Sequence, residues 1–415
     1  MPAPPVRPGR PMDGLTRRTF LQASGVAGAA ALLAGAARVS YDQLVQRAAT
    51  NPLDAGTPIL VLVTLYGGND WLNTVVPYAD PAYQAARPGL AYAAQEVHRL
   101  DDEWGLSPGL SGLAGEWQAG RLAIVRGVGY PKPDRSHFRS MDIWQTASPD
   151  RPIATGWLGR WLDSAGTDPL LALNVGSTLP PLVVGERACA SALSLGEERT
   201  AGASTLAALA ATDPADSPAA RLVSASYAAC GAVETALAPL ASAGTPSAVA
   251  GGAGRSASDL GAQLSLVAQG IKAGVPTRAY TASLGGFDTH ADERDSQQNL
   301  LTRMDAALTG FRDALAGHPR EPDVVVVAYS EFGRRVRANA SDGTDHGTAG
   351  NVLLVGPQVR GGLVGDAPSL TQLVDGDLAV TTDFQAVYAA VLDHVLQTDP
   401  ERILGPGHAA LPLFA

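Results

Sequence analysis

Lysine and cysteine are almost missing from this sequence of 415 residues. It contains two lysines, Lys132 and Lys272, so arginine supplies nearly all of the positive charge. It also contains two cysteines, Cys189 and Cys230, and neither belongs to a Cys-x-x-Cys pair, which argues against a catalytic thiol. In an oxidising compartment the two can form a disulfide bond; otherwise they are two buried thiols.

Net positive charge and long hydrophobic runs are missing too. The formal net charge is −10, and an acidic chain lacks the basic surface that nucleic-acid binding requires, so we expect no nucleic-acid partner. Beyond the first forty residues no apolar run is long enough to span a bilayer, so we expect no stable membrane span in the processed protein. With 46% hydrophobic and 17% charged residues, the composition is that of a globular protein.

The N-terminal segment has the pattern of an export signal. A basic run ends in Arg17-Arg18 with Phe20 and Leu21, and a weakly apolar stretch rich in alanine and glycine follows over residues 22–37. Paired arginines before a modest apolar stretch are typical of the twin-arginine signal. A transmembrane anchor is the alternative, but the stretch is short for a bilayer span.

We therefore predict a twin-arginine signal over residues 1–38, with cleavage near Ala34-Gly35-Ala36, and a single domain over residues 39–415. The signal holds five arginines and one aspartate, so its removal changes the net charge from −10 to −14. The predicted partner is the twin-arginine export machinery. The predicted location is periplasmic, cell-wall-associated or extracellular.

Apolar runs alternate with helical stretches along the rest of the chain. The runs are continuous, which predicts strands covered on both faces. The predicted fold class is α/β, a three-layer α/β/α architecture with a large mostly parallel sheet. Strands are expected at residues 59–66, 122–128, 170–175, 182–184, 278–284, 323–329 and 351–355. Helices are expected at residues 137–146, 157–165, 217–241, 257–273, 296–316 and 383–396. Residues 186–275, rich in alanine and with a Gly/Ala/Ser-rich loop at 244–255, predict a helical insertion.

Polar side chains collect where the predicted strands end. The groups Gly67-Gly68-Asn69-Asp70, Arg135-Ser136-His137, Gly286-Phe287-Asp288-Thr289-His290 and Ser330-Glu331-Phe332-Gly333-Arg334 each follow a strand, and Asp345-His346 precedes the last one. In open α/β sheets ligands bind beyond the carboxyl ends of the strands, so these groups are expected to meet. Carboxylate with imidazole suits Zn²⁺, Mn²⁺ or Fe, whereas a set richer in carboxylate favours Mg²⁺ or Ca²⁺.

Ser136 stands at the start of a predicted helix. Backbone N–H groups at a helix N-terminus attract anions, so Ser136 can be a nucleophile beside an anion site. An ordinary helix N-cap is the alternative.

These motifs, in this order and after a twin-arginine leader, resemble the DUF1501 family of exported bacterial proteins, which is grouped with the alkaline phosphatase and sulfatase superfamily. The resemblance covers essentially the whole chain after the signal. It implies an alkaline-phosphatase-like fold and hydrolysis of a small anionic substrate, a phosphate or sulfate ester, with one or two divalent metal ions. Carried over by position, it implies Ser136 as nucleophile and a set of metal ligands: Asp70, Asp288, His290, Glu331 and His346.

Two departures from the superfamily's pattern stand in the sequence. Its Asp-His pair is here Glu331-Phe332, which removes one nitrogen ligand, and Asp288 and His290 are closer together than the usual Asp-x-x-x-His. A site for one metal ion, or a degenerate binding site, is therefore the alternative to a complete two-metal site.

Two functions follow. The first is a metal-dependent hydrolase, in which His137 acts as general acid or base or anchors its helix, and Asn69, Arg135 and Arg139 contact substrate. Surface ion pairs are the alternative role for both arginines. The second is a secreted binding or structural protein that has lost catalysis. A metal-free serine hydrolase is less favoured, because no Gly-x-Ser-x-Gly motif occurs.

Overall fold

The computed structural model describes residues 38–166, 168–176, 179–193 and 259–415. The predicted helix at 217–241, the loop at 244–255 and Cys230 lie outside the described residues. Cys189 is buried. Among the residues described, no helix is both long and apolar enough to cross a membrane.

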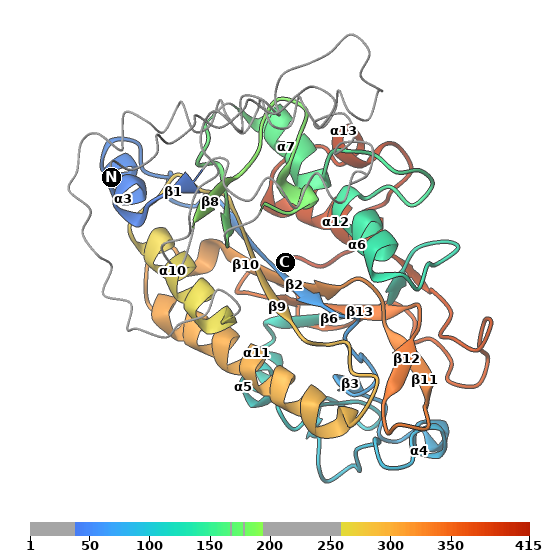
Figure 1. Cartoon of the computed structure of the whole chain (residues 1–415). Helices are drawn as coiled ribbons and strands as arrows, with labels where there is room; N and C mark the ends of the chain where they lie inside the picture. The colour runs from blue at the N-terminus through green and yellow to red at the C-terminus, as the bar shows by residue number, and fades with distance from the viewer. Residues whose placement is uncertain (1–37, 167, 177–178, 194–258) are drawn as a thin grey trace, which may run out of the picture.

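A large mixed sheet forms the centre of the molecule (Figure 1). Its strands lie in the order β1-β8-β7-β9-β2-β10-β13-β6-β14, with β15 also paired to β6. All neighbouring pairs on this path are parallel except the two that β13 makes, with β10 and with β6. The bounds are β1 Arg38–Val39, β2 Ile59–Tyr66, β6 Leu122–Gly129, β7 Ala172–Val175, β8 Ser191–Leu193, β9 Ala279–Gly285, β10 Val324–Ser330, β13 Gly350–Val355, β14 Gly362–Val364 and β15 Thr382–Asp383.

Helices cover both faces of this sheet, which confirms the three-layer α/β/α class (Figure 1). One side carries α3 Tyr41–Thr50, α5 Ser111–Gln118, α10 Leu260–Lys272 and α11 Glu293–Leu315. The other side carries α6 His137–Thr146, α7 Trp157–Ala165, α12 Phe384–Ala390 with a π-helical turn at Val391–Val395, and α13 Glu401–Leu404. Strands β2 and β10 are buried almost throughout, as their continuous apolar sequences predict.

The register of the central strands fixes where the functional segments meet. Tyr66 at the end of β2 pairs with Gly285 at the end of β9, and Leu65 pairs with Ser330 at the end of β10. The three strands are parallel and end level with one another. The polar groups that follow them therefore leave the sheet at one edge, as the sequence predicts.

Short elements near this edge complete the fold. Strands β11 Arg334–Ala338 and β12 Thr344–His346 form a hairpin that brings Arg334 opposite His346. Near it lie α4 Pro81–Ala86 and a small antiparallel sheet of β3 Val75–Val76, β4 His98–Arg99 and β5 Gly105–Leu106.

Two sequence predictions differ from the structure. The strand predicted at 182–184 is a 3-10 turn, Pro181–Val183, because Pro180 and Pro181 cannot donate the backbone hydrogen bonds of a ladder. Within the predicted helical insertion, β8 joins the main sheet between β1 and β7, and α10 packs against α11.

Candidate metal centre

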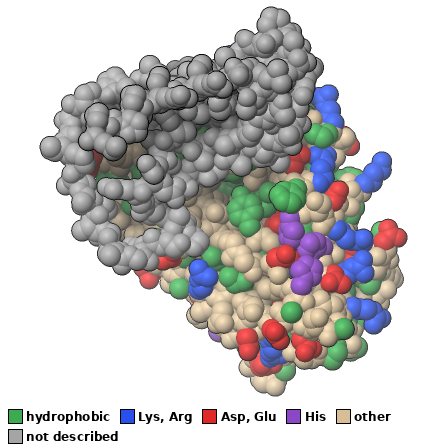
Figure 2. Space-filling view, in the orientation of Figure 1, with side chains coloured by type: hydrophobic (Ala, Val, Ile, Leu, Met, Phe, Trp, Pro, Cys, Tyr) green, Lys and Arg blue, Asp and Glu red, His purple; other side chains and the backbone are tan. Residues whose placement is uncertain are grey.

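Three histidines and one aspartate lie together at the carboxyl-terminal edge of the sheet. His137 begins α6, Asp288 and His290 follow β9, and His346 ends β12. We call these four residues the histidine–aspartate centre. Figure 2 shows histidine side chains gathered on one face of the molecule, with arginine and acidic side chains beside them. Because the Asp288 side chain is 49% exposed, solvent reaches the centre.

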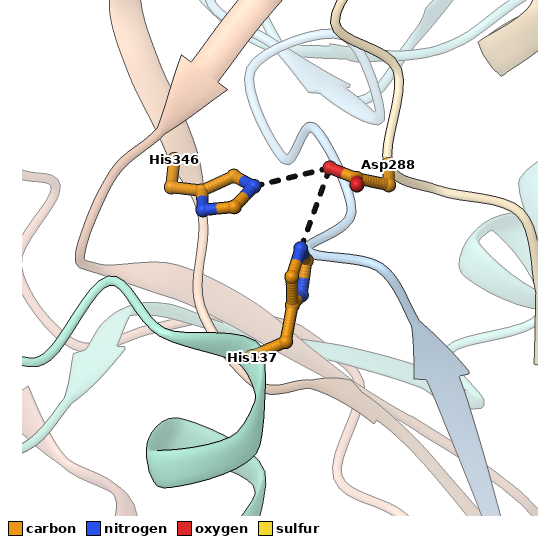
Figure 3. Close-up of side chains that lie close together, drawn as sticks. All are labelled: His137, Asp288 and His346. Atoms are coloured by element: carbon orange, nitrogen blue, oxygen red, sulfur yellow. Dashed lines mark hydrogen bonds and ion pairs between the residues drawn. The ribbon is translucent and has the colours of Figure 1, made fainter.

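One carboxylate oxygen of Asp288 is the hub of this centre. Its Oδ1 lies 3.4 Å from Nε2 of His137, 3.0 Å from Nε2 of His290 and 3.1 Å from Nε2 of His346. Figure 3 shows His137 and His346 pointing toward it from separate elements. The Nε2 atoms of His290 and His346 are 2.9 Å apart. All three imidazoles thus present the same ring nitrogen to the same oxygen.

The other ring nitrogen of each histidine faces an acceptor. Nδ1 of His137 lies 2.8 Å from Oε1 of Glu331. Nδ1 of His346 lies 2.8 Å from the backbone carbonyl oxygen of Arg135. Nδ1 of His290 lies 3.4 Å from Oδ1 of Asp345. Because carbonyl and carboxylate oxygens only accept, a ring hydrogen on Nδ1 completes the contacts of His137 and His346, while a hydrogen on Nε2 of His346 completes its 3.1 Å contact with Asp288.

That arrangement has an electrostatic consequence. In a neutral imidazole with hydrogen on Nδ1, Nε2 is a lone pair, so the centre would hold lone pairs facing one another and a carboxylate. Nε2 of His137 is a buried atom without a hydrogen-bond partner. A cation relieves that arrangement, either as protons on the rings, with which His346 donates to Asp288, or as a metal ion. Imidazole nitrogen and carboxylate oxygen are ligands of Zn²⁺, so the residues fit a divalent metal, and His137, Asp288 and His346 offer ligand atoms within 4.8 Å of one another.

Arg334 holds Asp288 in place. Its fully buried side chain donates to Asp288 at 2.7 Å and to the backbone carbonyls of Gly68, Thr344 and Phe287. Although burial opposes the change, hydrogen bonds from Arg334 and His346 lower the pKa of Asp288 to about 2. Asp288 therefore remains a carboxylate at any physiological pH.

Glu331, a predicted metal ligand, lies just outside the centre. Oε1 accepts from the backbone N–H of Gly67 at 2.9 Å as well as facing His137, and Oε2 accepts from the hydroxyl of Ser330 at 2.9 Å. The hydrogen bond that the Glu331 carboxylate accepts from His137 raises the pKa of His137, against the opposing effect of burial. Its carboxylate is thus engaged in orienting His137.

Asp70, another predicted ligand, lies in a separate buried network. It forms an ion pair with Arg87, with both side chains fully buried, and Nη2 of Arg87 donates to its Oδ1 at 3.0 Å. Burial by itself would raise the pKa of Asp70, but the charge and hydrogen bonds of Arg87 lower it. The structure therefore gives Asp70 a guanidinium partner and does not bring it to the centre.

Two further polar residues belong to the same buried network. The side chain of Asn69 bonds to Thr74 and Gln297, so it is not presented to a substrate. Glu293 accepts from Thr344 at 2.6 Å, and burial together with the charge of Asp70 raises its pKa to about 9.

Ser136 stands beside the centre at the N-cap of α6 and is exposed. Its hydroxyl makes no capping hydrogen bond, so the side chain does not act as an ordinary helix N-cap. The residue before it supplies the carbonyl that holds His346, and the residue after it is His137. Ser136 is thereby fixed in the chain between two contacts of the centre.

The two arginines predicted to contact substrate have protein partners. Nε of Arg135 donates to Asp377 at 2.8 Å, and Arg139 forms an ion pair with Asp142 three residues on. Arg334 is the guanidinium that reaches the centre. It belongs to the Ser-Glu-Phe-Gly-Arg motif, so its place after a buried strand was the available sequence signal.

Comparison with protein families gives two matches. A family model described as "Protein of unknown function (DUF1501)" matches residues 58–409. A model of the twin-arginine translocation pathway signal sequence matches residues 14–34. The second match confirms the predicted signal, so the protein is exported.

The solved structures that match this chain share little sequence with it. A protein in the alkaline phosphatase superfamily from Vibrio parahaemolyticus has a TM-score of 0.40 and 10% identity, over 87% of this chain and 76% of that chain. The crystal structure of Ps i-CgsB has a TM-score of 0.37 and 8% identity, over 85% and 77%. Its complex with k-i-k-neocarrahexaose has a TM-score of 0.37 and 9% identity, over 83% and 78%. No curated protein matches the sequence.

Proposed function

This chain belongs to the DUF1501 family and is exported by the twin-arginine route, and we propose that it is a metal-dependent hydrolase of phosphate or sulfate esters. The observation that carries the proposal is the convergence of three Nε2 atoms on Oδ1 of Asp288. His137, Asp288 and His346 would hold the ion, with His290 beside them. A bound divalent cation supplies a Lewis acid for an ester oxygen and lowers the pKa of a nearby hydroxyl.

Ser136 is the nucleophile in this proposal. Its Oγ forms a bond to phosphorus or sulfur while the bond to the leaving oxygen breaks. The proton of the serine hydroxyl ends on that oxygen, which departs as the alcohol. Water then cleaves the serine ester and restores the hydroxyl, releasing phosphate or sulfate. The unused capping position of its hydroxyl and its place between Arg135 and His137 support this role.

The surroundings of Ser136 suit an anionic substrate. Helix α6 has ten residues, and its N-terminus carries the partial positive charge and unpaired N–H groups of a helix start. An anion placed there would lie beside the imidazoles of the centre, which supports an ester with negatively charged oxygens over a neutral one.

The test uses protein exported by its native route. Elemental analysis should find a divalent metal, and the metal-loaded protein should release the phenol from an aryl phosphate or an aryl sulfate. Treatment with a chelator should abolish release, and returning the metal should restore it. Protein that carries no metal, or loaded protein that hydrolyses neither ester, contradicts the proposal.

A second candidate is a metal-binding protein without catalysis. The engagement of Arg135 with Asp377 and of Arg139 with Asp142 favours it, because no predicted substrate arginine is left to bind an anion. It predicts bound metal with no turnover of either ester.

A further inference from the structure

We propose that the histidine–aspartate centre is a three-nitrogen, one-oxygen site for a zinc-class transition-metal ion, with its imidazoles set in advance by Glu331, the Arg135 carbonyl and Asp345. The proposal rests on the metal binding that the proposed function requires, and it adds the class of ion and the residues that select it. His137, Asp288 and His346 already offer ligand atoms within 4.8 Å of one another, and His290 is added as the fourth ligand because its Nε2 lies 3.0 Å from Oδ1 of Asp288 and 2.9 Å from Nε2 of His346.

The donor atoms decide the class of ion. Nε2 of each of the three histidines faces the interior of the centre, with Oδ1 of Asp288 as the oxygen. Imidazole suits Zn²⁺, Cu²⁺, Fe²⁺ and Ni²⁺, and four ligands of this type are the usual number for zinc. Ca²⁺ takes six to eight oxygen ligands, and Mg²⁺ prefers an octahedron of oxygens.

Other carboxylates near the centre are bound to protein partners, so they do not add oxygen ligands to it. Glu331 is 2% exposed and accepts from Gly67 and Ser330. Asp70 is fully buried and forms an ion pair with Arg87. Asp345 faces Nδ1 of His290, the outer ring nitrogen, which points away from Asp288. One oxygen against three nitrogens is therefore the composition that the fold presents.

The outer nitrogens are what prepare the histidines for a metal. Metal-binding histidines commonly donate their second ring nitrogen to a carboxylate or a backbone carbonyl, which fixes the tautomer and the ring orientation. Nδ1 of His137 faces Glu331 and Nδ1 of His346 faces the Arg135 carbonyl, each at 2.8 Å, while Nδ1 of His290 faces Asp345 at 3.4 Å.

Phe332 adds a rigid apolar wall. Its ring centroid lies 4.9 Å from that of His137 and 4.9 Å from that of His346, and the side chain is buried. This residue stands where the superfamily's pattern has a second histidine. Here it packs against two ligands and supplies no donor atom, and an apolar shell of this kind also limits water at the site.

The first experiment titrates the full-length, chelator-treated protein with each metal alone. Calorimetry should show one Zn²⁺ per chain, and Zn²⁺ should raise the melting temperature by mass action. Mg²⁺ and Ca²⁺ at the same concentration should bind at least a hundredfold more weakly. Equal affinity for Zn²⁺ and Mg²⁺ or Ca²⁺ would overturn the proposal.

The second experiment removes the outer partners while keeping the ligands. Glu331→Gln should lower the affinity for Zn²⁺ by about 10- to 100-fold, the usual effect of losing such a partner. Asp345→Asn, at an exposed position, should lower it in the same direction and serves if the first variant does not fold. His290→Ala should also lower it, whereas His408→Ala, which removes an imidazole elsewhere, should not. Affinities unchanged in both Glu331→Gln and Asp345→Asn would refute the assignment.

The outcome is separable from that of the proposed function. Ser136→Ala should bind Zn²⁺ as the wild type does. A protein that binds Zn²⁺ in this manner but cleaves no ester supports the zinc site and contradicts the proposed hydrolase. A protein that cleaves esters with Mg²⁺ bound in place of Zn²⁺ does the reverse.

Discussion

Oε1 of Glu331 lies 2.8 Å from Nδ1 of His137, and the two residues are 194 positions apart in the chain. One directly follows the buried strand β10, and the other begins α6. The same oxygen accepts from the backbone of Gly67 at the end of β2. The orientation of His137 is therefore set by the rigid central strands, and not by the exposed loop that precedes it.

Replacing Ser136 by alanine tests the nucleophile. We expect ester hydrolysis to fall by about a thousandfold or more, because the covalent intermediate cannot form. Metal content should remain that of the wild type. The comparison variant is Ser341→Ala, an exposed serine in the β11–β12 hairpin, which should retain activity. Steady-state kinetics on an aryl ester would measure both, and an active Ser136→Ala enzyme would exclude this residue.

Asp70→Asn separates a structural role from metal binding. Removing one partner of a fully buried ion pair takes away the main counter-charge of Arg87, and we expect a loss of up to about 3–5 kcal/mol in the free energy of unfolding, reduced to the extent that the neighbouring Glu293 ionises in place of Asp70. The folded variant should still bind one metal ion. Asp142→Asn breaks the half-buried pair with Arg139 and should cost less than about 1 kcal/mol. Loss of the metal with little loss of stability would instead make Asp70 a ligand.

Glu293→Gln should change how stability depends on pH. The pKa of Glu293 is about 9 in the folded protein, against 4.5 for an ordinary glutamate, because of burial and the charge of Asp70. Between these values the folded state holds a proton that the unfolded state has released. Its contribution to stability is therefore complete below pH 4.5 and decreases as the pH rises toward 9, by about 1.4 kcal/mol per pH unit.

The glutamine is neutral at every pH, so the free energy of unfolding of the variant should increase relative to that of the wild type as the pH rises from 6 to 8.5. Urea unfolding at several pH values measures the difference. Glu96→Gln, at the surface, should keep the slope of the wild type. Parallel curves for the wild type and Glu293→Gln would show that Glu293 is ionised in the folded protein.

Gly68→Ala should disturb the centre through Phe332. Gly68 has φ of +70°, and an added Cβ would lie 2.2 Å from Cε2 of Phe332. A left-handed alanine costs about 1–2 kcal/mol, and overpacking adds about 1–3 kcal/mol. Because Phe332 packs on His137 and His346, the affinity for metal should fall as well.

Gly89→Ala is the matched control for this variant. Gly89 has φ of +83°, and nothing lies within 4 Å of its added Cβ. It should show the backbone cost alone, with metal binding unchanged. Equal losses of stability in the two variants, measured by thermal or urea unfolding, would mean that Phe332 moves aside freely.

The central strands could be predicted from the sequence because they are buried on both faces. Residues 59–66 form a strand with the predicted bounds, and α6 and α7 begin and end where the sequence indicates. Strand β11, with its sequence Arg-Arg-Val-Arg-Ala, was missed, because three arginines conceal the alternation of a hairpin at the surface. That hairpin carries both Arg334 and His346.

The sequence could not predict which residues contact the site residues in the folded protein. Asp70 and Asp288 each follow a glycine-containing turn after a strand, and nothing local distinguishes them. What separates them is Arg87, which reaches the carboxylate of Asp70 from α4's C-terminal end. The positions of Asp288, His290 and His346 could be anticipated from strand ends, whereas the contact between Glu331 and His137 depends on register across the sheet.

The four residues of the centre come from three segments that are as much as 209 positions apart, His137 to His346, so the centre does not form in an unfolded chain. The twin-arginine route moves proteins that have already folded. On the metal binding proposed above, a chain exported in this way would cross the membrane with its ion already bound. The metal supply of the compartment where the protein folds, and not that of its destination, would then decide which ion the exported protein contains.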